Sequence, residues 1–111
     1  MKENQALEAF SALSNATRLE VFRYLIKMAP EAVPAGDIAR EVEVPASTMS
    51  TQLAILSRAG LITSLRSGRV VSYRADVEGV RALLNYLVRD CCHGKPEVCA
   101  NLIAAVLPSC C

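Results

Sequence analysis

The residues with the most distinctive chemistry are five cysteines, all within the last 21 residues of a chain of 111. They form an adjacent pair at Cys91 and Cys92, a single thiol at Cys99, and a terminal pair at Cys110 and Cys111. Only six residues separate Cys92 from Cys99, so a loop that brings these thiols together costs little entropy. Three thiolates without harder ligands select soft ions, whereas structural zinc usually takes four ligands in a tetrahedron. The spacing therefore predicts a three-sulfur site at Cys91, Cys92 and Cys99 that suits trivalent arsenic or antimony.

A second group of residues has the types that contact DNA. Met49, Leu53 and Leu56 fall within a narrow arc of a helical wheel, which predicts a helix with these side chains in the core. The rest of this helix is rich in hydroxyl groups, and Ser and Thr are poor choices for a merely solvated helical face. Hydroxyl, amide and guanidinium groups bind phosphates and base edges. The predicted DNA-contacting residues are Ser47, Thr48, Ser50, Thr51, Gln52, Arg58, Arg66 and Arg69.

The distribution of charge supports this prediction although the net charge is only +1. Residues 44–75 contain no acidic residue, while they include Arg58, Arg66, Arg69 and Arg74. One basic surface on a mildly acidic body is typical of proteins that bind a phosphate backbone.

Length and composition narrow the class of protein. A chain of this length with 52% hydrophobic residues predicts one compact domain, with a body over residues 1–90 and a cysteine-rich segment over residues 91–111. We expect neither a membrane span nor a signal peptide, because no apolar run is long enough and the N-terminus is polar. A cytoplasmic location, where thiols stay reduced, follows as an expectation. An enzyme is not expected, since no glycine-rich phosphate loop surrounds any cysteine.

The pattern of apolar residues predicts mostly helix with one small β-hairpin, in the order α-α-α-α-β-β-α-α. The first helix is expected over residues 4–13, with Leu7, Phe10 and Leu13 on one stripe. The second helix is expected to be capped by Ser14 or Asn15, with Leu19, Phe22, Leu25 and Ile26 on its buried face. Residues 31–34 are expected to be extended. A third helix begins near residue 36, and a fourth, capped by Ser47 or a neighbour, ends at Gly60 in a left-handed conformation. Strands over 61–65 and 70–74 form the hairpin, and helices over 77–91 and 96–108 complete the chain.

Several of these segments resemble the ArsR/SmtB metalloregulators. Residues 12–19 (ALSNATRL) are similar to the opening signature of that family, and residues 47–56 (STMSTQLAIL) followed by 59–62 (AGLI) are similar to its recognition helix. Residues 69–73 match its second wing strand, and the resemblance extends over roughly residues 6–87.

The resemblance implies a homodimeric winged helix-turn-helix repressor that binds double-stranded operator DNA and releases it when an inducer binds. Two metal sites known in the family are missing, because residues 36–42 contain no Cys or His and residues 80–89 contain no His or carboxylate. Arsenite sensors of the family carry a vicinal cysteine pair with a third cysteine nearby, which Cys91, Cys92 and Cys99 match. The expected inducer is arsenite, or else antimonite. Cys110 and Cys111 are weaker candidate ligands, and the first and sixth helices are expected to form most of the dimer interface.

Other functions remain open at this point. The cysteines can oxidise, as in a thiol redox sensor, or bind cadmium, lead or zinc in a regulator of the same fold. A small arsenate reductase is a further alternative, although no phosphate-binding loop surrounds any cysteine. A metal-scavenging protein is another, although it would not need a winged helix. Binding to operator DNA, measured with and without arsenite, separates these possibilities.

Overall fold

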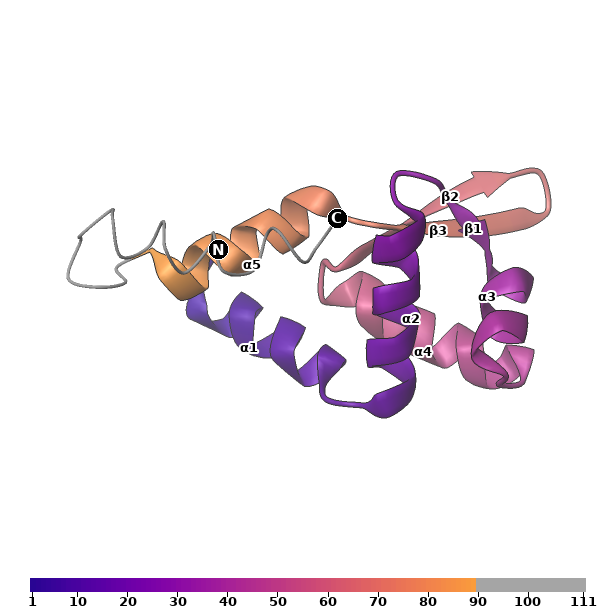
Figure 1. Ribbon diagram of the computed structural model, residues 1–111, viewed down its shortest axis with the longest axis horizontal. Coiled ribbons are helices and arrows are strands. Elements are labelled where there is room, and N and C mark those ends of the chain that lie inside the picture. The colour runs from indigo at the N-terminus through magenta and orange to yellow at the C-terminus, as the bar shows by residue number, and fades with distance from the viewer. Residues whose placement is uncertain (90–111) are drawn as a thin grey trace.

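The computed structural model describes residues 1–89, which hold five helices and three strands (Figure 1). In chain order these are α1 (Glu3–Leu13), α2 (Ala16–Met28), β1 (Val33–Pro34), α3 (Ala35–Val42), α4 (Ala46–Arg58), β2 (Ile62–Ser67), β3 (Val70–Ala75) and α5 (Val77–Val88). The predicted winged helix-turn-helix is confirmed over this range. The predicted sixth helix and all five cysteines lie outside the described residues.

The sheet is antiparallel with the strand order β1-β3-β2. The predicted hairpin is confirmed: Ile62 pairs with Ala75, and the register runs outward to Ser67 paired with Val70. The stretch expected to be extended supplies β1, in which Val33 pairs with Tyr73. The short strand β1, which lies between α2 and α3 in the chain, thus connects the hairpin to the helices.

Local signals in the sequence explain some of the helix boundaries. Asn15 caps α2, where its side-chain oxygen accepts a hydrogen bond from the backbone N–H of Arg18 at 3.1 Å. Gly60 follows α4 with a φ of 79°, which is the left-handed conformation that glycine adopts without strain. The prediction that Ser47 caps α4 is wrong, because Pro45 occupies the cap position and Ser47 lies inside the first turn. The hydroxyl of Ser47 is therefore not committed to capping the helix.

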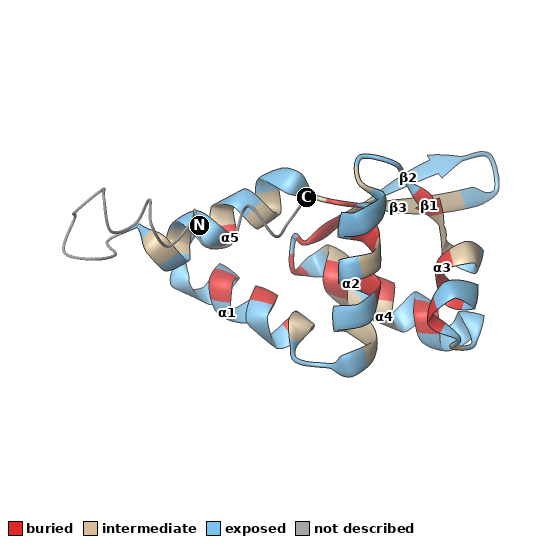
Figure 2. Ribbon diagram, in the orientation of Figure 1, coloured by how far each residue is buried: buried red, intermediate tan, exposed pale blue. Residues whose placement is uncertain are grey.

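The core lies among the helices and includes three residues of the strands, Val33, Ile62 and Ala75, while most of the hairpin is not buried (Figure 2). Met49, Leu53 and Leu56 of α4 are fully buried, as the helical wheel predicts. They pack in one cluster with Leu25 of α2 and Ile38 of α3. The opposite side of α4 therefore faces outward, which the position of a recognition helix requires.

Helices α1 and α2 bury only part of the apolar stripes that the sequence defines. In α1 the buried side chains are those of three alanines, whereas Leu7 and Phe10 are 59% and 40% exposed. Small alanine side chains allow α1 to approach α2, α4 and α5 closely, and the larger apolar side chains then lie on the other face. In α2, Leu25 is buried as predicted together with Val21, while Leu19 and Ile26 are exposed. The buried alanines are Ala6, Ala9 and Ala12.

Helix α5 packs unusually tightly against the turn that follows α4. Its cap residue Asp76 accepts a hydrogen bond from the backbone N–H of Gly79 at 3.0 Å. A Cβ added at Gly79 would clash with the backbone carbonyl of Gly60. Because Gly79 has no side chain, the backbone of α5 can approach the backbone at Gly60 more closely than it could with any other residue at this position.

We expect Gly79→Ala to lower the free energy of unfolding by about 1–3 kcal/mol, since rigid backbone must shift to accept the methyl group. Gly36→Ala in α3 is the matched control, because its added Cβ would meet only the flexible guanidinium of Arg40, at 3.7 Å. That substitution should stabilise the protein by about 0.4–1 kcal/mol. Urea denaturation of both variants measures the difference, and equal stabilities would contradict the close approach.

Candidate nucleic-acid interface

Helix α4 presents a continuous polar surface opposite its buried side. Ser47, Thr48, Ser50 and Thr51 are all exposed, and they lie in the first two turns of the helix. None of these four side chains donates or accepts a hydrogen bond with another of the described residues in the structure. Short hydroxyl side chains let a helix approach the floor of a major groove, where they bind phosphates or base edges.

The turn between α3 and α4 sets the orientation of the polar surface. Glu43 ends α3 in the left-handed conformation with a φ of 61°, and the backbone N–H of Val44 donates to the carbonyl oxygen of Ala39 at 3.1 Å. Only three residues connect the two helices, and the last of them, Pro45, occupies the cap position of α4. A short helix, a tight turn and a second helix with an exposed polar face make up the helix-turn-helix arrangement.

Gln52 differs from the other predicted DNA-contacting residues on α4. It is half-buried, and its Oε1 accepts a hydrogen bond from Nη1 of Arg18 at 2.8 Å. A guanidinium only donates, so the amide must turn its oxygen toward Arg18. Paired contact with adenine uses the amide oxygen as well as the NH₂ group. Such a contact would therefore compete with Arg18.

The β2–β3 hairpin forms an exposed basic wing. Gly68 in its turn has a φ of 63°, and Arg66 and Arg69 on either side are exposed. Arg58 at the end of α4 and Arg74 in β3 are exposed as well. Among residues 1–89 the ion pairs join Arg40 to Asp37 and Arg81 to Glu78, so these four arginines have no carboxylate partner there. Their charges are available for phosphates.

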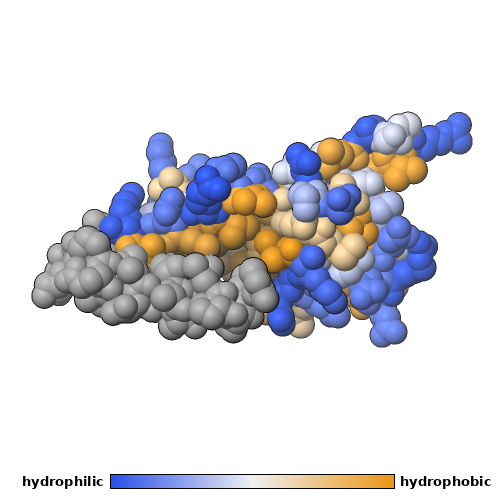
Figure 3. Space-filling model, turned by 45° about the horizontal axis from the view of Figure 1, so that its top comes forward, coloured by the Kyte–Doolittle hydropathy of each residue, from blue (hydrophilic) through white to orange (hydrophobic). Residues whose placement is uncertain are grey.

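Four exposed apolar residues of α1 and α5 lie away from α3 and the tip of the hairpin. Figure 1 shows α3 and the tip of the hairpin at one end, and α1 with most of α5 toward the other. Leu7 and Phe10 of α1 are exposed there, as are Leu84 and Leu87 of α5, which contacts α1. Figure 3 shows hydrophobic side chains gathered in a band across one face. We call the four residues the apolar α1–α5 face.

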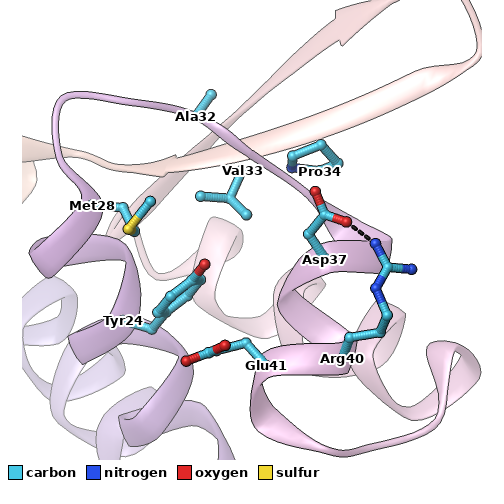
Figure 4. Close-up of a pocket in the computed structure, with 8 residues that line it drawn as sticks. All are labelled: Tyr24, Met28, Ala32, Val33, Pro34, Asp37, Arg40 and Glu41. Atoms are coloured by element: carbon cyan, nitrogen blue, oxygen red, sulfur yellow. Dashed lines mark hydrogen bonds and ion pairs between the residues drawn. The ribbon is translucent and has the colours of Figure 1, made fainter.

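An open hollow of about 500 Å³ lies between α2, β1 and α3 (Figure 4). Its rim carries the ion pair between Asp37 and Arg40, together with the carboxylate of Glu41. No group of three or more His, Cys, Asp or Glu side chains within residues 1–89 has the arrangement of a metal site. The hollow is lined by Tyr24, Met28, Ala32, Val33, Pro34, Asp37, Arg40 and Glu41.

The predicted inducer ligands Cys91, Cys92 and Cys99, with Cys110 and Cys111, fall outside the described residues. The site formed by these thiols stays a prediction from the sequence. Within residues 1–89, no helix is long and apolar enough to cross a membrane.

Comparison with known proteins agrees with this geometry. A family described as a helix-turn-helix domain matches residues 13–64, which run from the end of α1 into β2. The chain is 33% identical over 95 residues to YbzH, an uncharacterized HTH-type transcriptional regulator of Bacillus subtilis. That alignment covers 75% of this chain and 95% of YbzH.

Solved structures show the same fold. An ArsR-like transcriptional regulator from Rhodococcus superposes with a TM-score of 0.69 at 24% identity, covering 93% of this chain and 90% of that one. A homodimeric winged helix-turn-helix DNA-binding domain from Mycobacterium bovis, a possible ArsR-family regulator, has a TM-score of 0.63 at 24% identity. It covers 78% of this chain and 81% of its own. The chain belongs to the helix-turn-helix transcriptional regulators, and it has the winged-helix fold of their ArsR-like members.

Proposed function

We propose that this regulator is a homodimeric repressor of the ArsR/SmtB type that leaves its operator when trivalent arsenic, or antimony, binds to Cys91, Cys92 and Cys99. The exposed hydroxyl surface of α4 supports the DNA-binding half of the proposal, together with a wing whose arginines have no carboxylate partner among residues 1–89. The sensing half rests on the spacing of the three thiols in the sequence. Arsenite would form three As–S bonds, and its three hydroxyl groups would leave as water with the thiol protons.

Coupling between the thiol site and the DNA-binding surface requires that packed elements connect the thiols to helix α4. Cys91 and Cys92 follow α5 in the chain, and α5 contacts α1 and abuts the α4–β2 turn through Gly79. Binding of the inducer at the end of α5 would therefore act on the elements that hold α4. Allosteric couplings of this kind are typically ~1–3 kcal/mol, which corresponds to a loss of DNA affinity of roughly 5–150-fold.

An operator titration tests the proposal. A duplex selected by the wild-type protein from a random library would be bound by reduced protein, with affinity measured by fluorescence anisotropy at increasing arsenite. We expect the affinity for the operator to fall about tenfold or more, which is within the usual range of allosteric coupling. At saturation each subunit should hold one arsenic atom. Release by peroxide that a dithiol reverses would instead identify a thiol redox sensor, and release by cadmium, lead or zinc alone would identify a metal sensor. No change with any of these compounds would refute regulation through the cysteines.

The apolar α1–α5 face is the proposed subunit contact. In a two-fold interface each residue is buried twice, and burial of a phenylalanine contributes about 1.5–3 kcal/mol. Phe10 is 40% exposed, so an interface would bury only that part of each side chain, and we expect Phe10→Ser to raise the dimer dissociation constant by about tenfold or more. Operator binding should weaken as well, because two linked reading helices span two half-sites. Analytical ultracentrifugation measures the dissociation constant.

Leu65→Ser is the matched control for Phe10→Ser. Leu65 is exposed to a similar extent but lies on the wing, away from α1 and α5. It should leave the dimer intact. An unchanged dimer in Phe10→Ser would show that the subunits meet elsewhere.

A further inference from the structure

Arg18 is the one described residue that joins three helices through its own hydrogen bonds. It lies in the first turn of α2, and its Nε donates to the carbonyl oxygen of Ala12 in the last turn of α1 at 2.6 Å. Its Nη1 donates to Oε1 of Gln52 in the middle of α4 at 2.8 Å. Its backbone N–H is itself held by the side chain of Asn15. Arg18 is thus constrained from both ends of its side chain.

The chemistry of the guanidinium makes this link stiff. Its donors lie in one plane at fixed angles, so the positions of the Ala12 and Gln52 oxygens are tied to each other. The last carbonyl groups of α1 lack partners within the helix, and the negative end of the helix dipole attracts a cation there. Both hydrogen bonds are partly buried, where water competes less well for the same groups.

The link connects the two functional ends of the protein. Helix α1 carries Leu7 and Phe10 of the proposed subunit interface, and Gln52 follows directly after the exposed Ser50 and Thr51 on α4. In a dimer, the angle between α1 and α4 sets the distance between the two α4 helices. Reading successive major grooves requires about 34 Å between them. A change of a few degrees at the bridge between α1 and α4 would therefore misalign both reading helices.

We propose that Arg18 is a positioning residue for DNA binding: it sets the orientation of α4 relative to α1 through Ala12 and Gln52, and it does not itself contact DNA. This inference rests on the proposed roles of α4 as the reading helix and α1 as part of the subunit interface. It adds a residue that the polar surface of α4 does not reveal. Operator affinity should then depend on the geometry of this bridge. The number of phosphates that the protein contacts should stay the same when the bridge is broken.

Two mild substitutions test the bridge from its two sides. Arg18→Lys keeps the charge but cannot reach both oxygens with fixed geometry, and Gln52→Met keeps the size but removes the acceptor. Each should weaken binding to the selected operator about tenfold, the usual equivalent of one hydrogen bond to a charged group. The double variant should lose little more than either single one, because both changes break the same hydrogen bond. Arg23→Lys, on an exposed arginine of the same helix, is the matched control and should bind normally.

The salt dependence separates positioning from contact. Removing a phosphate contact lowers the slope of log K against log salt by about 1 for each phosphate. Arg18→Met should lower operator affinity by about tenfold or more with an unchanged slope. A reduced slope would overturn the proposal in favour of direct contact, and so would additive losses in the double variant or normal affinity in Arg18→Lys. Circular dichroism at the assay temperature shows which variants are folded. If one of them unfolds, the operator affinities of the remaining folded variants test the proposal.

Failure of this inference can be distinguished from failure of the proposed function. Ser47→Ala with Thr51→Ala removes hydroxyl groups of the exposed α4 surface without touching the bridge. If that variant binds the operator normally, α4 is not the reading helix. If it binds weakly while the Arg18 and Gln52 variants bind normally, α4 reads DNA but the bridge does not position it.

Discussion

Cys91→Ser, Cys92→Ser and Cys99→Ser should each bind the operator as tightly as the wild-type protein and should each fail to release it with arsenite. Loss of any one of the three thiols leaves arsenic with at most two As–S bonds, so the three-coordinate thiolate complex that is expected to hold the segment rigidly cannot form. The wild-type protein should lose affinity about tenfold or more on arsenite addition, as expected for an allosteric coupling of ~1–3 kcal/mol. Each variant should instead change less than about twofold, well below that coupling range. Fluorescence anisotropy with the selected operator measures both quantities.

The double variant Cys110→Ser with Cys111→Ser is the matched control, because it removes two thiols from the same segment without touching the three predicted ligands. It should retain release by arsenite. If all three single variants still respond, the inducer site is not at Cys91, Cys92 and Cys99. If only the double variant fails, the terminal pair is the receptor and the spacing argument is wrong.

The combined variant Arg66→Ala with Arg69→Ala should weaken binding to every duplex, whatever its sequence, and should reduce the salt dependence. Both guanidinium groups are exposed at the tip of the wing and have no carboxylate partner among residues 1–89. Removal of one arginine–phosphate interaction lowers the salt slope by about 1, and a dimer carries every such interaction twice. The slope should therefore fall by about 2–4, which corresponds to a large decrease in affinity at low salt.

Arg81→Ala is the control for the wing variant, since Arg81 is paired with Glu78 on α5 and lies outside the basic segment. It should leave the slope unchanged. A normal slope in the wing variant would mean that the wing does not approach the backbone, and that the phosphates are bound elsewhere.

Much of the candidate DNA-binding surface follows from local sequence. The spacing of Met49, Leu53 and Leu56 defines which side of α4 is buried, because a helix repeats every 3.6 residues and apolar side chains avoid water. The remaining side of α4 is then the polar, exposed one. Gly60 and Gly68 mark the turns that bound α4 and the wing, since both positions need a positive φ. These features are local in sequence, so no tertiary contact is needed to identify them.

The choice of buried face in α1 cannot be made from local sequence. Periodicity shows that Leu7 and Phe10 share a face, but a core face and a subunit interface are both apolar, so the pattern fits either one. Close packing against α2, α4 and α5 selects the alanines for the core, because only small side chains let the helices approach. The larger residues are left exposed, where the proposed subunit interface would cover them.

The order of residues is enough to specify the helix-turn-helix, the polar surface of α4 and the basic wing, because each depends on residues within about four turns of helix or one hairpin. Three other features emerge only from the packing of whole helices: which face of α1 is buried, the approach of Gly79 to Gly60, and the link that Arg18 makes between Ala12 and Gln52. Each of them brings together residues that are distant in the chain. Their geometry depends on how the helices fit against one another, which no short stretch of sequence encodes.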